Sequence, residues 1–121
     1  MGKARLAQVP TTNTQTQTMK TNELSGTALD YAVNLIEECC DDPFQPMFST
    51  SWAQGGPIIE REGIAIRKSF DDERNEWVAN LWSENITIFE DGPTPLIAAM
   101  RCFVASKLGD EVSVPEELCE H

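Results

Sequence analysis

Apolar residues recur three and four positions apart between residues 24 and 40, which predicts an amphipathic helix. Ser25 suits the N-cap position, and Leu24 before it can pack against Leu29 in the first turn. Acidic residues follow the apolar stripe and oppose the helix dipole, so we expect the helix to end near Cys40. Its predicted buried face consists of Ala28, Leu29, Ala32, Val33, Ile36 and Cys40.

A second apolar stripe predicts another helix between Thr94 and Gly109. Thr94 is a good N-cap, and Pro95 fits the first helical position because that residue needs no N–H partner. Gly109 suits the C-terminal stop, and Lys107 in the last turn interacts favourably with the helix dipole. The predicted buried face of this helix consists of Leu96, Ile97, Met100, Phe103, Val104 and Leu108.

Between these helices, three short segments show the apolar alternation of β-strands, at residues 64–70, 77–82 and 86–89. Short polar turns connect them, which is typical of an antiparallel meander. Residues 112–115 are a candidate for an additional short edge strand. The pattern as a whole predicts an α+β fold in which two helices pack on a three- to four-stranded antiparallel meander.

The segment before the first of these strands contains Gly55, Gly56 and Pro57 in a row. Residues 48–52 are β-prone, and the Gly-Gly-Pro step predicts a tight turn after them. Pro57 then suits the start of a helix of one or two turns, which we expect to stop at Gly63.

Domain organisation follows from the polar N-terminus. Residues 1–18 hold a run of Thr, Asn and Gln with nothing to bury, so we expect a disordered leader. Residues 19–121 make up one α+β domain, because about 100 residues suffice for a single small core. The N-terminus lacks the apolar stretch of a signal peptide, and no apolar run approaches the ~18 residues of a membrane span, which indicates a cytoplasmic protein.

The charge of the chain narrows the range of partners. It carries 20 acidic and 9 basic residues, a formal net charge of -11. This balance argues against direct binding of nucleic acid and against an anionic membrane surface, both of which attract basic proteins. A partner attracted by charge would be a basic protein, although an acidic surface also serves solubility alone.

The residues needed for common catalytic devices are scarce. The one histidine is His121, the last residue, which excludes most Ser-His and Cys-His nucleophile arrangements and histidine-ligated metal sites. The four cysteines form no Cys-x-x-Cys pair, so we expect reduced thiols. The acidic clusters lack EF-hand spacing. We therefore predict no catalytic residues, no metal and no cofactor.

The best candidate for ligand binding is the predicted glycine turn. Gln54, Gly55 and Gly56 precede a helix, and free N–H groups at a helix N-terminus bind anions. Trp52 beside the turn offers an indole for stacking. The predicted site is completed by charged residues from the two following helices, namely Glu60, Arg61 and Arg101.

Arg101 has a structural interpretation as well. It lies at the edge of the apolar stripe, and we expect it to pair with Glu60 or Glu62. The two glutamates also define the enzymatic alternative, a small enzyme that uses carboxylates only, with Glu60 and Glu62 as acid and base.

Several segments of the sequence resemble the NinX-like proteins of temperate enterobacterial phages, a family of unknown function. These segments are MKT at 19–21, LSG at 24–26, WAQGGPIIE at 52–60, GPTPLIAAMR at 92–101 and VASKLGDEV at 104–112. Ser51 stands where we expect Asp in many family members. The resemblance implies a phage or prophage accessory protein that acts in the bacterial host cytoplasm, and it supplies no catalytic residues. The pattern also resembles the phage ABA-sandwich domain.

The resulting functional hypothesis is a non-catalytic binding protein that modulates a host process or defence. Its partner is either a basic host protein, docked by the acidic surface in imitation of DNA, or a small anionic ligand at the glycine turn. The sequence leaves the oligomeric state open, homo-oligomers included.

Overall fold

The computed structural model describes residues 16–38, 47–69, 76–83 and 85–118, and it confirms an α+β fold. In chain order, the elements are β1 (Thr16–Lys20), the 3-10 helix η2 (Thr21–Glu23), α1 (Gly26–Glu37), α2 (Trp52–Glu62), β2 (Ala65–Lys68), β3 (Trp77–Ser83), β4 (Ile86–Gly92), α3 (Pro95–Leu108), β5 (Glu111–Pro115) and the 3-10 helix η3 (Glu116–Leu118).

The strands form two separate sheets. β2, β3 and β4 make the predicted antiparallel meander, whereas β5 pairs with β1 in a two-stranded antiparallel ribbon. The predicted edge strand therefore exists but does not extend the meander. Thr16, Gln17 and Thr18, which the sequence assigned to the leader, belong to β1. Residues 1–15 lie outside the described part of the chain.

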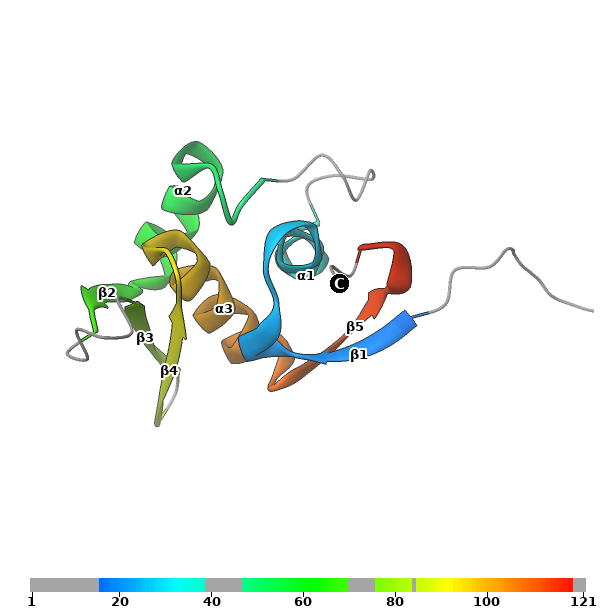
Figure 1. Ribbon diagram of the computed structural model, residues 1–121. Helices are drawn as coiled ribbons and strands as arrows, with labels where there is room; N and C mark the ends of the chain where they lie inside the picture. Colours follow the sequence, from blue (N-terminus) through cyan, green and yellow to red (C-terminus); the bar gives the residue numbers. More distant parts are fainter. Residues whose placement is uncertain (1–15, 39–46, 70–75, 84, 119–121) are drawn as a thin grey trace, which may run out of the picture.

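Helix α3 is the centre of the molecule. It packs against the meander on one side and against α1 on the other, as Figure 1 shows. Because neighbours cover it on both sides, large side chains such as Met100 and Phe103 are completely buried. Its ends are those predicted: the Thr94 hydroxyl accepts the Ile97 N–H (3.1 Å), and the Gly109 N–H closes the last turn.

Helix α1 packs on α3 and β5 rather than on the meander, which corrects the predicted packing of both helices against one sheet. Ser25 occupies the N-cap position, as predicted, but its side chain makes no capping hydrogen bond, and Leu24 before it is fully buried. The helix ends at Glu37, and Glu38 takes the left-handed conformation with φ 54°, so the predicted extension to Cys40 is wrong. Cys39 and Cys40 themselves lie outside the described residues.

Helix α2 starts at Trp52, five residues before the predicted start at Pro57, and the Gly-Gly-Pro step lies inside it. The reason is packing. A Cβ atom on Gly55 would lie 2.5 Å from the Phe48 carbonyl oxygen and 2.7 Å from Leu96 Cδ1, so the helix needs glycine there to approach its neighbours. The predicted stop at Gly63 is confirmed, with a φ of 71°.

The β-prone segment at residues 48–52 forms no strand: residues 48–50 are a turn, and Trp52 begins α2. The Thr50 and Ser51 N–H groups both donate to the Met47 carbonyl oxygen. The Ser49 N–H donates to the buried Asp30 carboxylate of α1 (2.7 Å), which fastens the turn to that helix. A buried carboxylate needs such donors, so this contact competes successfully with strand formation.

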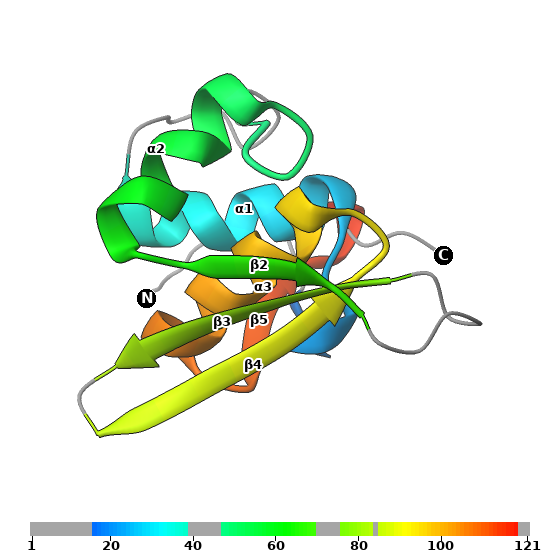
Figure 2. The same ribbon diagram turned by 90° about the vertical axis from the view of Figure 1, so that its left-hand side faces the viewer.

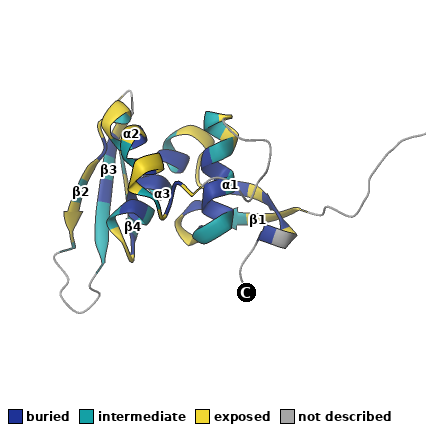
Figure 3. Cartoon of the chain, turned by 90° about the horizontal axis from the view of Figure 1, so that it is seen from above, coloured by how far each residue is buried: buried dark blue, intermediate teal, exposed yellow. Residues whose placement is uncertain are grey.

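The two faces of the meander differ in burial. Ala79 and Leu81 of β3 are buried against α3, as the alternation predicts. Figure 3 shows that the buried residues gather on α3 and on the elements facing it. The opposite face of the meander carries exposed side chains, Trp82 and Phe89 among them. In the described part of the chain, no helix has the length and apolar character of a membrane span.

Candidate functional site

The structure separates the predicted ligand-binding residues. Trp52, Gln54, Gly55, Gly56, Glu60 and Arg61 all lie on α2, whereas Arg101 lies on α3. They form three different environments: the N-terminal turn of α2, its C-terminal half, and the half-buried surroundings of Arg101. The structural premise of the predicted ligand site, a glycine turn before a helix, is wrong, because both glycines lie inside α2.

At the N-terminal turn of α2, Trp52 is 55% exposed. It borders a cavity of about 270 Å³ whose other walls come from Ser49, Thr50 and residues 94–97. Gln54 points elsewhere, because its Oε1 atom accepts the Met47 N–H (2.8 Å). The Gly55 N–H donates to the Ser51 carbonyl oxygen (2.8 Å) and is therefore occupied within the helix. The turn thus keeps an accessible indole but loses the predicted anion-binding N–H of Gly55.

At the other end of α2, Arg61 is engaged in ion pairs with Glu37 and with Glu62. These carboxylates, Glu37 first, raise the pKa of its guanidinium group. Glu62 also lies 3.6 Å from Lys107 Nζ, while Glu60 is exposed. Residues two apart on a helix point in different directions, so this geometry does not favour Glu60 and Glu62 as a paired acid and base.

Arg101 does not pair with Glu60 or Glu62 as predicted. Its Nε atom donates to the Leu24 carbonyl oxygen (2.7 Å), and its Nη1 atom donates to the Asp91 carbonyl oxygen (2.8 Å). Burial lowers the pKa of the guanidinium group, and the nearby acids Asp91 and Glu90 oppose this effect. Arg101 therefore ties the segment before α1 to the end of β4, close to Glu90.

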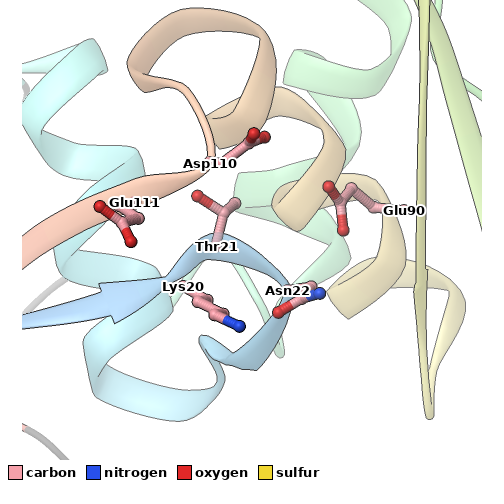
Figure 4. Close-up of a pocket in the computed structure, with 6 residues that line it drawn as sticks. All are labelled: Lys20, Thr21, Asn22, Glu90, Asp110 and Glu111. Carbon is pink, nitrogen blue, oxygen red and sulfur yellow. The ribbon is translucent and has the colours of Figure 1, made fainter.

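A larger cavity, of about 640 Å³, opens next to this arginine contact. Figure 4 shows the side chains around it, which come from three segments: the β1–η2 junction, β4, and the start of β5 with the residue before it. We call this cavity the acid-lined pocket. Its lining residues are Lys20, Thr21, Asn22, Glu90, Asp110 and Glu111.

Thr21 holds two walls of the acid-lined pocket together. Its side-chain hydroxyl donates to the Gly109 carbonyl oxygen (2.6 Å), and its N–H donates to the Asp110 carbonyl oxygen (2.7 Å). The pairing of β1 with β5 continues this connection, with Lys20 opposite Glu111. Backbone pairing and a buried threonine thus fix the positions of the acidic residues on this side.

The electrostatics of the pocket centre on Glu90. Burial raises the pKa of its carboxyl group, the nearby acids Asp91 and Asp110 raise it further, and Arg101 opposes them. With Asp110 and Glu111, the pocket has three carboxyl groups and one amino group, that of Lys20. A partly desolvated carboxylate among other acids is stabilised by an added cation. In the described part of the chain, no three His, Cys, Asp or Glu side chains lie close enough together to hold a metal ion.

Reasoning from the sequence missed the lining residues of this pocket. One signal was present: Glu90 shares the inner face of β4 with Ile88, where alternation calls for an apolar residue. An acidic residue at an inward-facing strand position often marks a functional group. The contribution of residues 20–22 was not readable, because it depends on the pairing of β1 with β5, nearly the full length of the domain apart.

Comparison with known protein families identifies the family of this chain. The family model described as Bacteriophage P22, NinX matches residues 38–107, more than half of the sequence. The chain belongs to this NinX family. The resemblance noted in the sequence is thereby confirmed, and the protein is a phage accessory protein. A search of curated proteins found no match.

The NinX match covers α2, the meander and nearly all of α3. Glu90 and Arg101 therefore lie within the family segment. The residues on the other side of the acid-lined pocket, at positions 20–22 and 110–111, lie outside it. One wall of the pocket thus belongs to the part matched by the NinX model, and the opposite wall is built from the flanking strands.

Proposed function

We propose that this NinX family member is a non-catalytic binding protein that modulates a host process through a protein partner in the host cytoplasm. The acid-lined pocket receives a lysine or arginine side chain of that partner. The observation that carries this proposal is the half-buried Glu90, whose carboxyl pKa is raised by burial and by neighbouring acids.

The choice of a basic side chain follows from charge and geometry. Ionising Glu90 beside Asp91 and Asp110 is unfavourable, and an incoming cation relieves this repulsion. The cavity of about 640 Å³ is large enough for a long flexible side chain. With a net charge of -11, the protein attracts a basic protein over a distance and repels nucleic acid phosphates.

The test compares two double variants that remove the same charge. Glu90→Gln with Asp110→Asn neutralises the acid-lined pocket, whereas Glu60→Gln with Glu116→Gln neutralises two exposed acids elsewhere. Each protein is immobilised and exposed to host lysate at low and high salt, and bound proteins are identified by mass spectrometry. We expect a basic protein that the wild type and the control retain at low salt and that the pocket variant loses.

Two outcomes of the pull-down would contradict the proposal. If the pocket variant, shown by thermal unfolding to be folded, retains the same basic proteins as the control, the pocket does not receive the partner. Binding that withstands high salt in the wild type would likewise argue against a charge-driven contact.

The small anionic ligand is the second candidate, and the accessible indole of Trp52 favours it. Together with Thr50 and Thr94, this residue borders the cavity of about 270 Å³ near the N-termini of α2 and α3. A panel of nucleotides titrated against tryptophan fluorescence tests this candidate. Quenching that disappears in Trp52→Phe but persists in Trp82→Phe would support it, and no quenching by any nucleotide would contradict it.

A further inference from the structure

In the described part of the chain, the outer face of the meander, turned away from α3, carries large exposed side chains. Figure 2 shows β2, β3 and β4 from this side, with α3 behind them. Trp82 is 78% exposed and Phe89 is 59% exposed. Exposed apolar side chains that gather on one face often mark an interaction surface. Strand register assigns the following side chains to this face: Ala65, Arg67, Val78, Asn80, Trp82, Thr87, Phe89 and Asp91.

The residues of the outer face lie in rows across the three strands. One row runs Arg67, Val78, Asp91, with the positive charge on β2 and the negative charge on β4. The next row runs Ala65, Asn80, Phe89, with the small side chain on β2 and the large one on β4. The face is therefore asymmetric across β3 both in charge and in size.

We propose that this face packs against the same face of a second copy of the chain, about a twofold axis parallel to β3. Such a rotation keeps the rows level and places β2 of each copy over β4 of the other. Arg67 then meets Asp91 of the second copy, and this contact occurs twice. Closed twofold dimers are the commonest oligomers, and their interface must be self-complementary in this way.

The second row supports the same arrangement. The rotation places Phe89 over Ala65 of the second copy, so that a large side chain meets a small one. Asn80 meets its own copy, and two carboxamide groups can each donate to and accept from the other. Trp82 also meets its own copy, which would cover the most exposed large apolar side chain of the described residues.

Arg67 and Asp91 also interact with other groups of their own chain. The dimer contact requires only that the two side chains carry opposite charges. Sheets that pack face to face align their strands within about 30° and lie about 10 Å apart, which this axis allows. Three strands about 4.8 Å apart make a narrow face. We therefore expect a small interface and a dissociation constant in the micromolar range.

Glu90 alternates with Phe89 and Asp91 on β4, so its side chain lies on the opposite face of the strand. Dimerisation through the outer face therefore leaves Glu90 on the α3 side of the sheet. The dimer does not depend on the proposed function.

Charge reversal tests the axis. Sedimentation velocity from low micromolar to near-millimolar protein should show a concentration-dependent dimer for the wild type. Arg67→Asp and Asp91→Arg should each remain monomeric alone, because like charges then meet at both contacts. An equimolar mixture of these two variants should form a heterodimer, because each contact between positions 67 and 91 then joins an acidic and a basic side chain.

A matched pair of tryptophan variants serves as the control. Trp82→Ser should weaken the dimer, whereas Trp52→Ser, which removes an exposed indole on α2, should not. Circular dichroism establishes that each variant is folded. A wild type that stays monomeric throughout, single variants that dimerise as well as the wild type, or a mixture that fails to associate would each overturn the proposal.

Discussion

The guanidinium group of Arg61 donates two hydrogen bonds to the carboxylate of Glu37, from Nη1 to Oε1 at 3.0 Å and from Nη2 to Oε2 at 2.7 Å. This contact joins the last turn of α2 to the last turn of α1. Two parallel hydrogen bonds give the pair more geometric specificity than a single ion pair has. The Arg61 guanidinium also lies 5.7 Å from the ring centroid of Phe103.

Replacing Arg61 by alanine should lower the free energy of unfolding by only about 0.5–1 kcal/mol, because the side chain is 51% exposed and solvent screens the pair. Urea unfolding of Arg61→Ala, Glu37→Ala and the double variant measures the coupling between the two residues. The coupling should fall as salt rises. Additive single effects would mean that the ion pair contributes nothing.

The adjacent glycines of α2 should respond to alanine in opposite directions. Gly55→Ala should destabilise the protein by about 1–3 kcal/mol, because its Cβ would collide with the Phe48 carbonyl oxygen and Leu96. Gly56→Ala should stabilise it by about 0.5–1 kcal/mol, because nothing lies within 4 Å of its Cβ and alanine favours the helix. Thermal unfolding of both variants decides the matter, and effects of the same sign would contradict the assigned packing of α2.

The Cys102 thiol should be unreactive in the folded protein. It is fully buried, and burial, followed by the charge of Glu90, raises its pKa to about 12. A variant with Cys39, Cys40 and Cys119 replaced by serine isolates this thiol. We expect a disulfide reagent at neutral pH to modify it only at the rate of unfolding. Rapid modification without denaturant would show that the core around α3 opens readily.

The raised pKa of Glu90 predicts a pH dependence of stability. The unfolded carboxyl group has the lower pKa, so as pH rises the unfolded state loses its proton first and the native state holds it longer. Stability from this group is present at low pH and is lost as pH rises through the raised native pKa. Glu90→Gln should therefore gain on the wild type with rising pH in urea unfolding. A difference that is constant with pH would contradict this assignment.

Sequence reasoning predicted α3 closely because its signals are local. Thr94, Pro95 and Gly109 mark the ends of the helix through their own backbone preferences, and the apolar stripe between them needs only one partner surface. The meander followed for the same reason, because strands joined by short turns pair with their neighbours.

The features that the sequence did not predict depend on distant contacts. Gly55 resembles a turn residue until the nearby Phe48 carbonyl oxygen and Leu96 show why no side chain fits. Arg101 donates its hydrogen bonds to the backbone carbonyl oxygens of Leu24 and Asp91, and no pattern of side chains in the sequence reveals such partners. The acid-lined pocket was missed because its walls meet only after β1 has paired with β5.

That pairing also sets an order of events during synthesis on the ribosome. The strands of the meander and α3 pack mostly against segments close to them in sequence, so they can assemble as they leave the ribosome. β1 is made first but has to wait for β5, whose last residue is Pro115. The Lys20 side of the pocket therefore closes only when nearly the whole described chain has been translated. A nascent chain would expose Glu90 before Lys20 and Asp110 join it, so the complete acid-lined pocket is a property of the finished domain.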